Sequence, residues 1–536
     1  MMKPIAFRRL LLSIAWLGVG TVCTLCSAWG AEHLTAISSG TDAVAVAPSS
    51  EQGAAQSLTL QQAFAMGLQN STAVKRVRFQ PLQVAEDYNK AKSIYDPVLF
   101  SVGSSERTNR PTQSALDGVP FDSALIEDRW QVQAGIKERL PTGGSIALYQ
   151  EAGRYDTNNR YTIPDPQYQS RIMATLSQPL LKGIGDQEGA AALQVASLNL
   201  QIADSAFKRD VLDILIEISQ NYWQLYLEQS IVRITRNSLA RAQEVYNREK
   251  IREKQGLSMP IDVDRALMAV KTRRASLLRA INQERLSIRK LWLLLAPERM
   301  FTPADLPDLV VQDLPRMEFD SWDRQKLQAE ALNRRQEMAI ARDTVAVSER
   351  QDSLAAHNQL PELNLKLNYG FSGLNDKQDN LLRDPYNSDF NNWRVELVFE
   401  WPIGGRSAEA EKSKAFYKLQ QSRTEMSLTK ERITQDVGVI LDELFLAEEE
   451  LQVTKMAMKA ADRVLKGEEA MFELGKKNNR DLLEGQNNYD TAEKEYLRAR
   501  ARYNLNLVSL ARAKGTLLND YGLNVEARPS TPRNKH

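Results

Sequence analysis

The feature that most constrains this chain is an internal duplication, in which the second half repeats the layout of the first. Leu68 and Leu332 each open a helical stretch, and the two stretches run the same distance to a proline, Pro97 or Pro361. In both halves that proline begins a segment with strand character, which leads to a second proline and then to a long helical stretch. Solenoid repeats are far shorter. The sequence therefore predicts two tandem copies of one unit, ordered helix, strand, strand, helix, helix.

The long helical stretches follow Pro179 and Pro402, and they end at Gly256 and at Gly475. A helix of such a size is about 100 Å long, so we expect it to extend into an aqueous space. Apolar residues recur in it at alternating steps of four and three, the spacing of coiled coils. They are Val211, Leu215, Ile218, Tyr222 and Leu225 in the first half, and Ile433, Val437, Ile440, Leu444, Ala447 and Leu451 in the second. A cytoplasmic coiled coil would explain these heptads equally well.

The second half predicts a β-hairpin over residues 362–401. Both of its strands alternate apolar with polar or charged residues, the apolar ones being Trp393, Val395, Leu397, Phe399 and Trp401, and Leu363, Leu365, Leu367, Tyr369 and Phe371. Strands of about nine to eleven residues cross a bilayer when tilted. Trp393 and Trp401 stand at the two ends of the apolar face, and with Tyr369 and Phe371 they form the candidate membrane girdle. A soluble hairpin with one wet face is the alternative, because such alternation is common in soluble sheets.

The first half holds four strand candidates between Pro97 and Pro179, where the second half holds two. Their apolar positions are Val98, Phe100 and Val102, then Val132, Ala134 and Ile136, then Ile146 and Leu148, and finally Ile172, Ala174 and Leu176. An open sheet cannot span a bilayer, because every backbone polar group there needs a partner. Other subunits must therefore meet the sheet edges. A trimer would have twelve strands with four per chain and eighteen with six, and the sequence leaves this choice open.

The N-terminus has the layout of a secretory signal peptide over residues 1–30, with basic residues, an apolar run and then small residues. The only two cysteines, Cys23 and Cys26, lie in this segment, so the mature chain would have none. A lipid-anchored cysteine is the competing interpretation. Residues 31–56 predict a disordered leader, and residues 521–536 a disordered tail.

The composition argues against several classes of function. The 69 Lys and Arg residues balance 68 Asp and Glu residues, so the chain lacks the basic excess of a nucleic-acid binder. Three histidines leave little material for a zinc or haem site. No nucleophile with a neighbouring base can be nominated either. We therefore expect no enzymatic activity, no cofactor, no metal and no nucleic-acid partner.

In the order of its motifs, the chain resembles the TolC family of outer membrane efflux proteins over about residues 57–520. The motifs are Leu58–Asn70, Leu176–Gly185, Gly256–Ala266, Leu360–Gly370, Trp393–Gly405 and Gly475–Gln486. The resemblance implies a mixed, mainly α fold in which a trimeric β-barrel in the outer membrane is continuous with a long α-helical coiled-coil barrel. The first repeat then spans 57–315, with strands at 97–179 and long helices at 187–297. The second spans 316–520, with the hairpin at 362–401 and long helices at 405–518.

The same resemblance implies a function and a set of partners. A homotrimer, held in outer membrane lipid and extending into the periplasm, would be the duct of a tripartite efflux or type I secretion system. A periplasmic adaptor and an inner-membrane pump or exporter would deliver solutes or proteins to it. The alternative is a periplasmic structural coiled-coil protein without channel activity.

Four residues are candidates for the periplasmic aperture of such a duct. Asp262, Asp481 and Glu484 follow the glycine turns between helices, where the family has acidic residues, and threefold symmetry would turn each into a ring of carboxylates. Lys477 stands where the family often has a basic residue that pairs across helices in the closed state. A simpler interpretation is that Asp262 and Asp481 only stabilise helix N-termini.

Overall fold

The computed structural model describes residues 56–295, 309–313, 322–387, 389–474 and 476–526. The predicted signal peptide, the predicted leader apart from Gln56, and the last ten residues of the predicted tail lie outside the described residues. Two compact units are present. One is a β-sheet built from residues 95–187 and 360–403, and the other is helical and holds the remaining described residues. Each predicted repeat contributes to both units.

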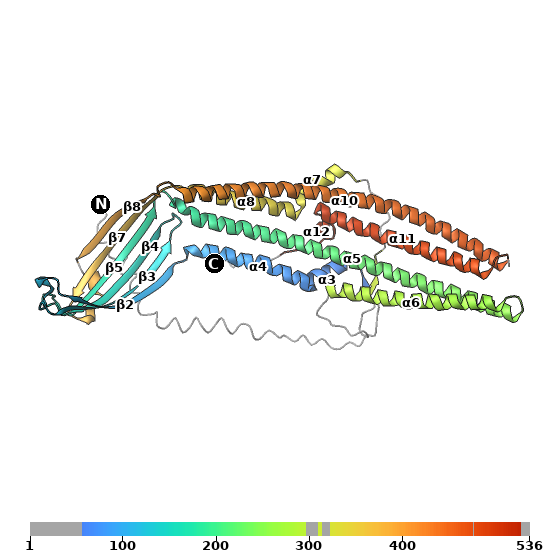
Figure 1. Cartoon of the computed structure of the whole chain (residues 1–536), viewed down its shortest axis with the longest axis horizontal. Helices are drawn as coiled ribbons and strands as arrows, with labels where there is room; N and C mark the ends of the chain where they lie inside the picture. Colours follow the sequence, from blue (N-terminus) through green and yellow to red (C-terminus); the bar gives the residue numbers. More distant parts are fainter. Residues whose placement is uncertain (1–55, 296–308, 314–321, 388, 475, 527–536) are drawn as a thin grey trace. The chain divides into compact units, whose positions relative to one another are not determined.

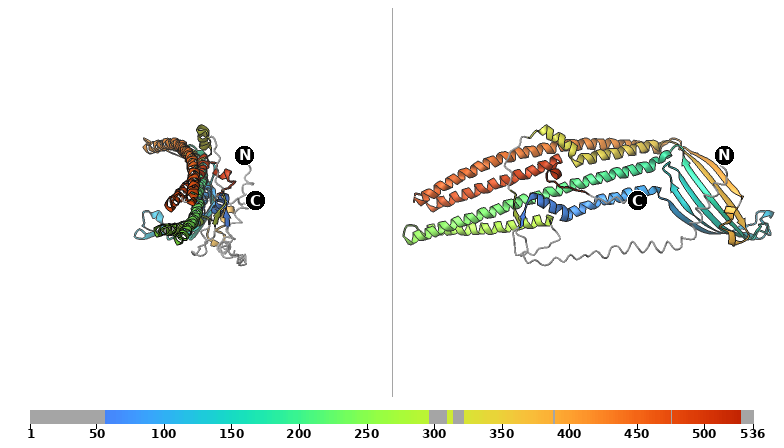
Figure 2. Two further views of the ribbon diagram at one scale, coloured as in Figure 1. Left: turned by 90° about the vertical axis from the view of Figure 1, so that its right-hand side faces the viewer. Right: turned by 180° about the vertical axis from the view of Figure 1, so that it is seen from behind.

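The sheet unit is one antiparallel sheet of six strands in the order β2-β3-β4-β5-β7-β8. Figures 1 and 2 show the strands following one another in that order from both sides. All four strand candidates of the first half therefore join the two of the second half in a single ladder. Their bounds are β2 (Val98–Pro111), β3 (Ala124–Arg139), β4 (Ser145–Thr157), β5 (Gln167–Pro179), β7 (Glu362–Asn375) and β8 (Asn391–Glu400), with the one-turn helix α9 (Asp384–Asn387) in the loop before β8.

The register of the ladder sorts the side chains onto two faces, because residues directly opposite each other in an antiparallel pair share a face. One row crosses all six strands through Trp393, Tyr369, Ala174, Leu148, Ile136 and Leu99. The predicted apolar sets of β3, β4, β5, β7 and β8 all fall on this face. The opposite face is polar, and there Arg171 contacts Glu151 at 2.6 Å. Around Trp393 the apolar face is uncovered within the described ranges, as the 73% exposure of that side chain indicates. Toward the loop before β8, α9 packs on the same face beside Gly373, and Ile172 there is only 7% exposed.

Strand β2 departs from this arrangement. Its apolar residues Val98, Phe100 and Val102 lie on the polar face, because Leu99 and not Phe100 stands opposite Ile136. The ring of Phe100 packs there near Tyr149, with the ring centroids 6.3 Å apart. Alternation within β2 predicts a strand, but its pairing with β3 decides which face each residue occupies.

The helical unit repeats its element lengths from one half of the chain to the other. Helices α3 and α7 have 11 residues each, α4 and α8 have 21 and 22, α5 and α10 have 68, and α6 and α11 have 36. Their bounds are α3 (Leu60–Asn70), α4 (Thr72–Lys92), α5 (Gln187–Lys254), α6 (Pro260–Leu295), α7 (Arg324–Arg334), α8 (Gln336–His357), α10 (Arg406–Glu473) and α11 (Asn479–Lys514), followed by α12 (Leu517–Asp520). The duplication seen in the sequence is therefore a duplication of helical hairpins, α5–α6 and α10–α11 (Figure 1).

The heptad residues form the interior of this unit, as predicted. Val211, Leu215 and Ile218 of α5 are completely buried, in a cluster that includes residues of α3, α6 and α11. Val437 and Leu444 of α10 are equally buried in a second cluster with α7 and α11. Helical stability here comes from packing of these apolar stripes. Helix α10 also leaves large apolar side chains exposed, among them Phe445, Leu446 and Met456.

A short parallel pair of strands, β1 (Gln56–Leu58) and β6 (Leu309–Val311), packs beside α5. The Tyr222 hydroxyl of α5 lies 3.0 Å from the Leu58 carbonyl oxygen and 2.8 Å from Oδ2 of Asp313. Asp313 also accepts a hydrogen bond from the backbone N–H of Leu60, at 2.6 Å. Tyr222 therefore connects α5 to the C-terminal ends of both β1 and β6.

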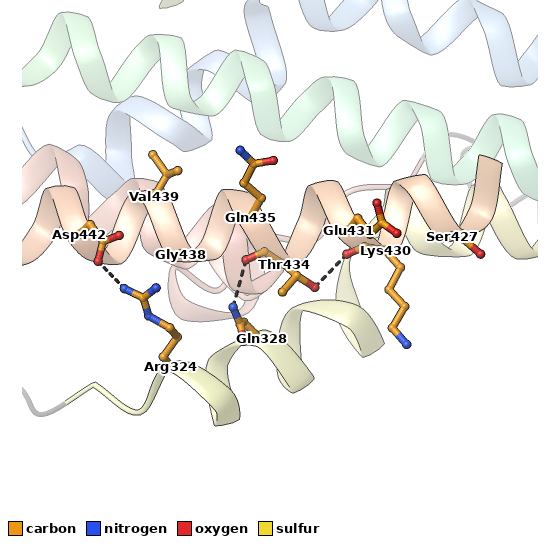
Figure 3. A pocket seen from close by; sticks show the side chains of 10 residues that line it. All are labelled: Arg324, Gln328, Ser427, Lys430, Glu431, Thr434, Gln435, Gly438, Val439 and Asp442. Carbon is orange, nitrogen blue, oxygen red and sulfur yellow. Dashed lines mark hydrogen bonds and ion pairs between the residues drawn. The ribbon is translucent and has the colours of Figure 1, made fainter. Parts of the chain in front are cut away.

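Helix α7 lies against α10 and borders an open groove, shown in Figure 3. Arg324 forms an ion pair with Asp442, and Nε2 of Gln328 donates to the Thr434 carbonyl oxygen at 3.1 Å. The lining also includes the exposed Lys430, so charges of both signs face the groove. The contacts of Arg324 and Gln328 hold α7 on α10. The mixed charges of the lining favour neither an anionic nor a cationic ligand.

Candidate functional site

The turns of the two helical hairpins are built on different backbone devices. Between α5 and α6, Gly256 adopts a φ of +73°, a conformation that other residues rarely accept. The side chain of Ser258 then donates to Glu249 at 2.6 Å and closes the turn against α5. Between α10 and α11, Asn478 caps α11, because its Oδ1 accepts from the backbone N–H of Asp481 at 3.1 Å. Gly475 lies outside the described residues.

Asp262 lies in the first turn of α6, and its carboxylate is already paired. Arg265, one turn along the same helix, contacts it at 2.8 Å. The backbone of Asp262 has a second role, since its carbonyl oxygen accepts from Nδ2 of Asn479 at 2.8 Å. That bond joins the start of α6 to the start of α11.

Asp481 and Glu484 have no cationic partner among the described residues at this end of the unit, and the same holds for Asp264 and Glu473. Within the described part of the chain, none of these four forms an ion pair with a Lys or Arg side chain within 4.0 Å. Asp481 is half-buried in the first turn of α11, and Glu484 is exposed one turn further on. The N-cap position belongs to Asn478, so Asp481 is a first-turn residue of α11.

Lys477 pairs within its own hairpin. Its Nζ lies 3.4 Å from Oε1 of Glu468 on α10. Glu468 in turn lies directly over Gly485 of α11, where a Cβ atom would come within 1.8 Å of Oε2. Gly485 therefore allows the Glu468 carboxylate to reach Lys477. The predicted pairing of Lys477 in a closed state of the trimer stays a prediction.

Two arginines that the sequence did not single out connect one hairpin to the other. Arg241 of α5 forms an ion pair with Asp490 of α11, whose side chain is only 7% exposed. Arg273 of α6 donates to Oε1 of Gln486 on α11 at 2.8 Å, and to the Ser238 carbonyl oxygen of α5 at 3.2 Å. Burial lowers the pKa of Arg273 below its usual value, yet a guanidinium remains charged under any physiological condition.

A small apolar cluster surrounds these bonds and consists of Val245, Ala266, Leu465, Phe472 and Leu482. The guanidinium groups of Arg248 and Arg252 each lie 5.8 Å from the centroid of the Phe472 ring, on a helix of the other hairpin. We call the bonds of Arg241, Arg273 and Asn479, together with this cluster, the hairpin junction. It holds α5–α6 and α10–α11 side by side near their turns.

A signal for the junction was present in the sequence but is weak. Gln486, Asp490 and Glu493 follow one another at steps of four and three on α11, which places polar groups on a stripe where a coiled coil has apolar ones. Such a stripe predicts a polar contact. It does not identify the partners, which belong to α5 and α6 in the other half of the chain.

Two features are absent from the described residues. No group of three or more His, Cys, Asp or Glu side chains there is arranged to hold a metal ion. None of the helices in the described ranges combines the length and the apolar composition of a membrane-crossing helix.

Comparison with known proteins gives matches to a family model and to a relative. Residues 327–516 match the family model for outer membrane efflux protein. The outer membrane protein TolC of Vibrio cholerae serotype O1 is 22% identical over 448 residues, which cover 83% of this chain and 93% of that protein. The chain is thus similar to outer membrane efflux proteins, through the family model in its second half and through TolC over most of its length. It is accordingly an outer membrane protein that extends into the periplasm, as the sequence predicted.

Solved structures agree with this efflux-protein fold. A membrane protein from Pseudomonas aeruginosa has a TM-score of 0.63 at 17% identity, covering 85% of this chain and 93% of that one. The outer membrane protein VceC from Vibrio cholerae has a TM-score of 0.61 at 16% identity, covering 85% of this chain and 96% of its own. The mainly helical fold with an antiparallel sheet is thus shared across nearly the full length of these proteins.

Proposed function

We propose that this chain forms a homotrimeric duct through which an inner-membrane pump or exporter and a periplasmic adaptor pass solutes or proteins outward. The observation that carries the proposal is the sheet of the described residues, which combines one apolar face, one polar face and two unpaired edges in β2 and β8. Such a sheet is stable in a bilayer only when copies close it into a barrel, because unpaired backbone groups are too costly in hydrocarbon.

The helical unit supports the same proposal. Each copy has two equivalent hairpins, each with one helix of 68 residues and one of 36. The longer helix of each hairpin is about 100 Å long. Three copies placed around an axis would supply six hairpins to a tube. The trimer would draw its energy from the pump, since transport through a tube needs no chemistry by the tube itself.

Asp481 and Glu484 are the proposed selectivity residues of the aperture. Threefold symmetry would place three copies of each carboxylate around the axis, and rings of carboxylates favour cations. Asp262 contributes less in this proposal, because Arg265 already compensates its charge. Lys477, paired with Glu468, would adjust the field near the ring and not form part of it.

The test begins with the state of the protein in fractionated membranes. We expect extraction from the outer membrane to require detergent, and light scattering with detergent subtracted to give the mass of a trimer. In planar bilayers, the double variant Asp481→Asn/Glu484→Gln is expected to lose cation selectivity. Glu449→Gln is the matched control, because Glu449 is an exposed carboxylate on α10. A monomer or dimer that needs no detergent would contradict the duct and favour the periplasmic structural coiled-coil protein.

A further inference from the structure

The apolar face of the sheet is not a horizontal band across the ladder. On β8 the apolar set runs from Phe399 to Trp393, and on β3 it runs from Ile136 to Trp130. The register carries Trp393 across β7, β5 and β4 to Ile136. Trp393, the end of the β8 set nearest the loop between β7 and β8, is therefore level with Ile136, the end of the β3 set nearest the turn between β3 and β4.

The strands between β8 and β3 lie at intermediate levels. In the register of β8, the set of β7 is centred near Val395, the set of β4 (Ile146 and Leu148) near Arg394, and the set of β5 near Trp393. The whole displacement is about six residues over four strands, or about 20 Å along the strands for about 19 Å across them. That slope corresponds to a tilt of about 45°, which is the tilt of strands in membrane barrels.

A flat hydrocarbon layer cutting a tilted sheet produces such a displacement, whereas a soluble hairpin added beside a barrel has no reason to continue it. Glu138 of β3 is consistent with this tilt. It lies outside the apolar set of β3, although the residues of β8 at the same level are still apolar. Strands β3 and β4 of the first half therefore follow the same membrane plane as β7 and β8.

We propose that all six strands of each chain cross the membrane and that β8 of one copy pairs with β2 of the next, so that three copies close an eighteen-stranded barrel. This inference rests on the proposed trimeric duct. An even number of strands per chain makes β2 and β8 antiparallel to each other, so the joint between copies continues the antiparallel ladder and repeats head to tail until it closes.

Both edge strands have the character that this joint needs. The residues of β2 and β8 are exposed along almost their whole length, and in the described part of the chain no strand lies beside the hydrogen-bonding groups on their outer sides. On its outward face β2 presents Ser101, Gly103 and Ser105, which are small and uncharged. They leave room for the large outward side chains of β8, Leu397 and Phe399.

The tilt also predicts the register of the joint. Continuing the displacement by one strand puts the centre of the band on β2 at about Gly103. On a strand that pairs with the outer edge of β8, the same step shifts the level of the band centre from Glu396 to about Leu397. The shift is toward the end of β8 at Glu400. Gly103 of one copy is therefore expected opposite Leu397 of its neighbour, to within one neighbouring position on the same face.

The strand count sets the width of the duct in the membrane. Each strand tilted by about 45° occupies about 6.5 Å of the circumference. Eighteen strands then give a backbone diameter of about 37 Å, whereas twelve give about 25 Å. A barrel of eighteen strands leaves an open aqueous lumen, which suits the polar inward face.

Disulfide trapping in intact outer membranes tests the joint. Leu397→Cys is combined in turn with Ser101→Cys, Gly103→Cys and Ser105→Cys, because directly opposite residues lie within disulfide reach. A Cβ at Gly103 meets no atom within 4 Å. We expect mild oxidation to give covalent dimers and trimers with at least one of these pairs. Leu397→Cys with Leu148→Cys is the matched control, since β4 has strands on both sides, and the single-cysteine variants control for Cys23 and Cys26.

The outcomes separate this inference from the proposed function. Cross-linked trimers through β2 and not through β4 would support the eighteen-stranded barrel. Detergent-extracted trimers that conduct ions but cross-link Leu397→Cys to β4, or to no position of β2, would overturn the joint and leave the duct intact. Absence of any trimer in detergent would overturn both.

Discussion

Replacing Arg241 with methionine is expected to loosen the hairpin junction without unfolding the helical unit. The substitution keeps most of the side-chain volume but leaves Asp490 without its partner at a position that is only 7% exposed. Removing one member of a buried ion pair costs about 3–5 kcal/mol. Arg241 itself is 27% exposed, and the charge of Arg273 also acts on this region, so we reduce the expected cost to about 2 kcal/mol.

Hydrogen exchange of the detergent-solubilised protein measures this cost locally. A loss of about 2 kcal/mol in the opening free energy corresponds to about 30-fold faster exchange. We expect that acceleration in the segments of α5 and α11 that contain Arg241 and Asp490, and none around β1 and β6. The double variant Arg241→Met/Asp490→Leu should exchange more slowly than Arg241→Met alone, because it also removes the Asp490 carboxylate that the single variant leaves without a partner.

Arg498→Met provides the control on α11. Arg498 forms an ion pair with Glu495 one turn away on the same helix, and both side chains are about half exposed, so the pair contributes less than about 1 kcal/mol. Exchange that Arg241→Met accelerates no more than Arg498→Met does would refute the role assigned to the junction.

Three further predictions concern the helical unit. Tyr222→Phe removes the hydroxyl that bonds β1 and Asp313, and we expect a loss of about 1–3 kcal/mol, measured as a lower thermal midpoint with faster proteolysis near β1. Leu215→Ala opens a cavity at a fully buried position and should cost about 2.7–5 kcal/mol; an unchanged midpoint would contradict the assigned core. Burial holds the pKa of Glu493 above its ordinary value, so stability should rise as the pH falls from neutral through that raised pKa, and Glu493→Gln should flatten this dependence in thermal unfolding between about pH 7 and pH 5.

The sequence predicted those parts of the fold that depend on periodic patterns. The steps of four and three through Val211, Leu215 and Ile218 identified the buried stripe of α5, because a helix repeats about every 3.6 residues. Alternation identified the strands for the corresponding reason. The equal spacing of Leu68–Pro97 and Leu332–Pro361 indicated the duplication, which the matching helix lengths of the two hairpins reproduce.

The parts that depend on pairing between distant segments could not be predicted. Phe100 looks like its counterparts in the other strands, but the register with β3 places it on the opposite face. Arg241 and Arg273 are two among many arginines on long polar helices, and nothing local distinguishes them from solvated charges. Asp262, Asp481, Glu484 and Lys477 lie around the turns where they were expected, while their roles in a pore remain for the conductance experiment to decide.

The matching lengths of the two hairpins restrict how this chain can change. The bond between Asn479 and the Asp262 carbonyl forms only if both hairpins reach the same height. An insertion of about seven residues into α10 and α11 alone would move the start of α11 by about 10 Å, beyond the reach of any side chain that now spans the junction. Insertions and deletions in one repeat are therefore expected to survive only with an equal change in the other, so that the two halves keep a common length while their residues diverge.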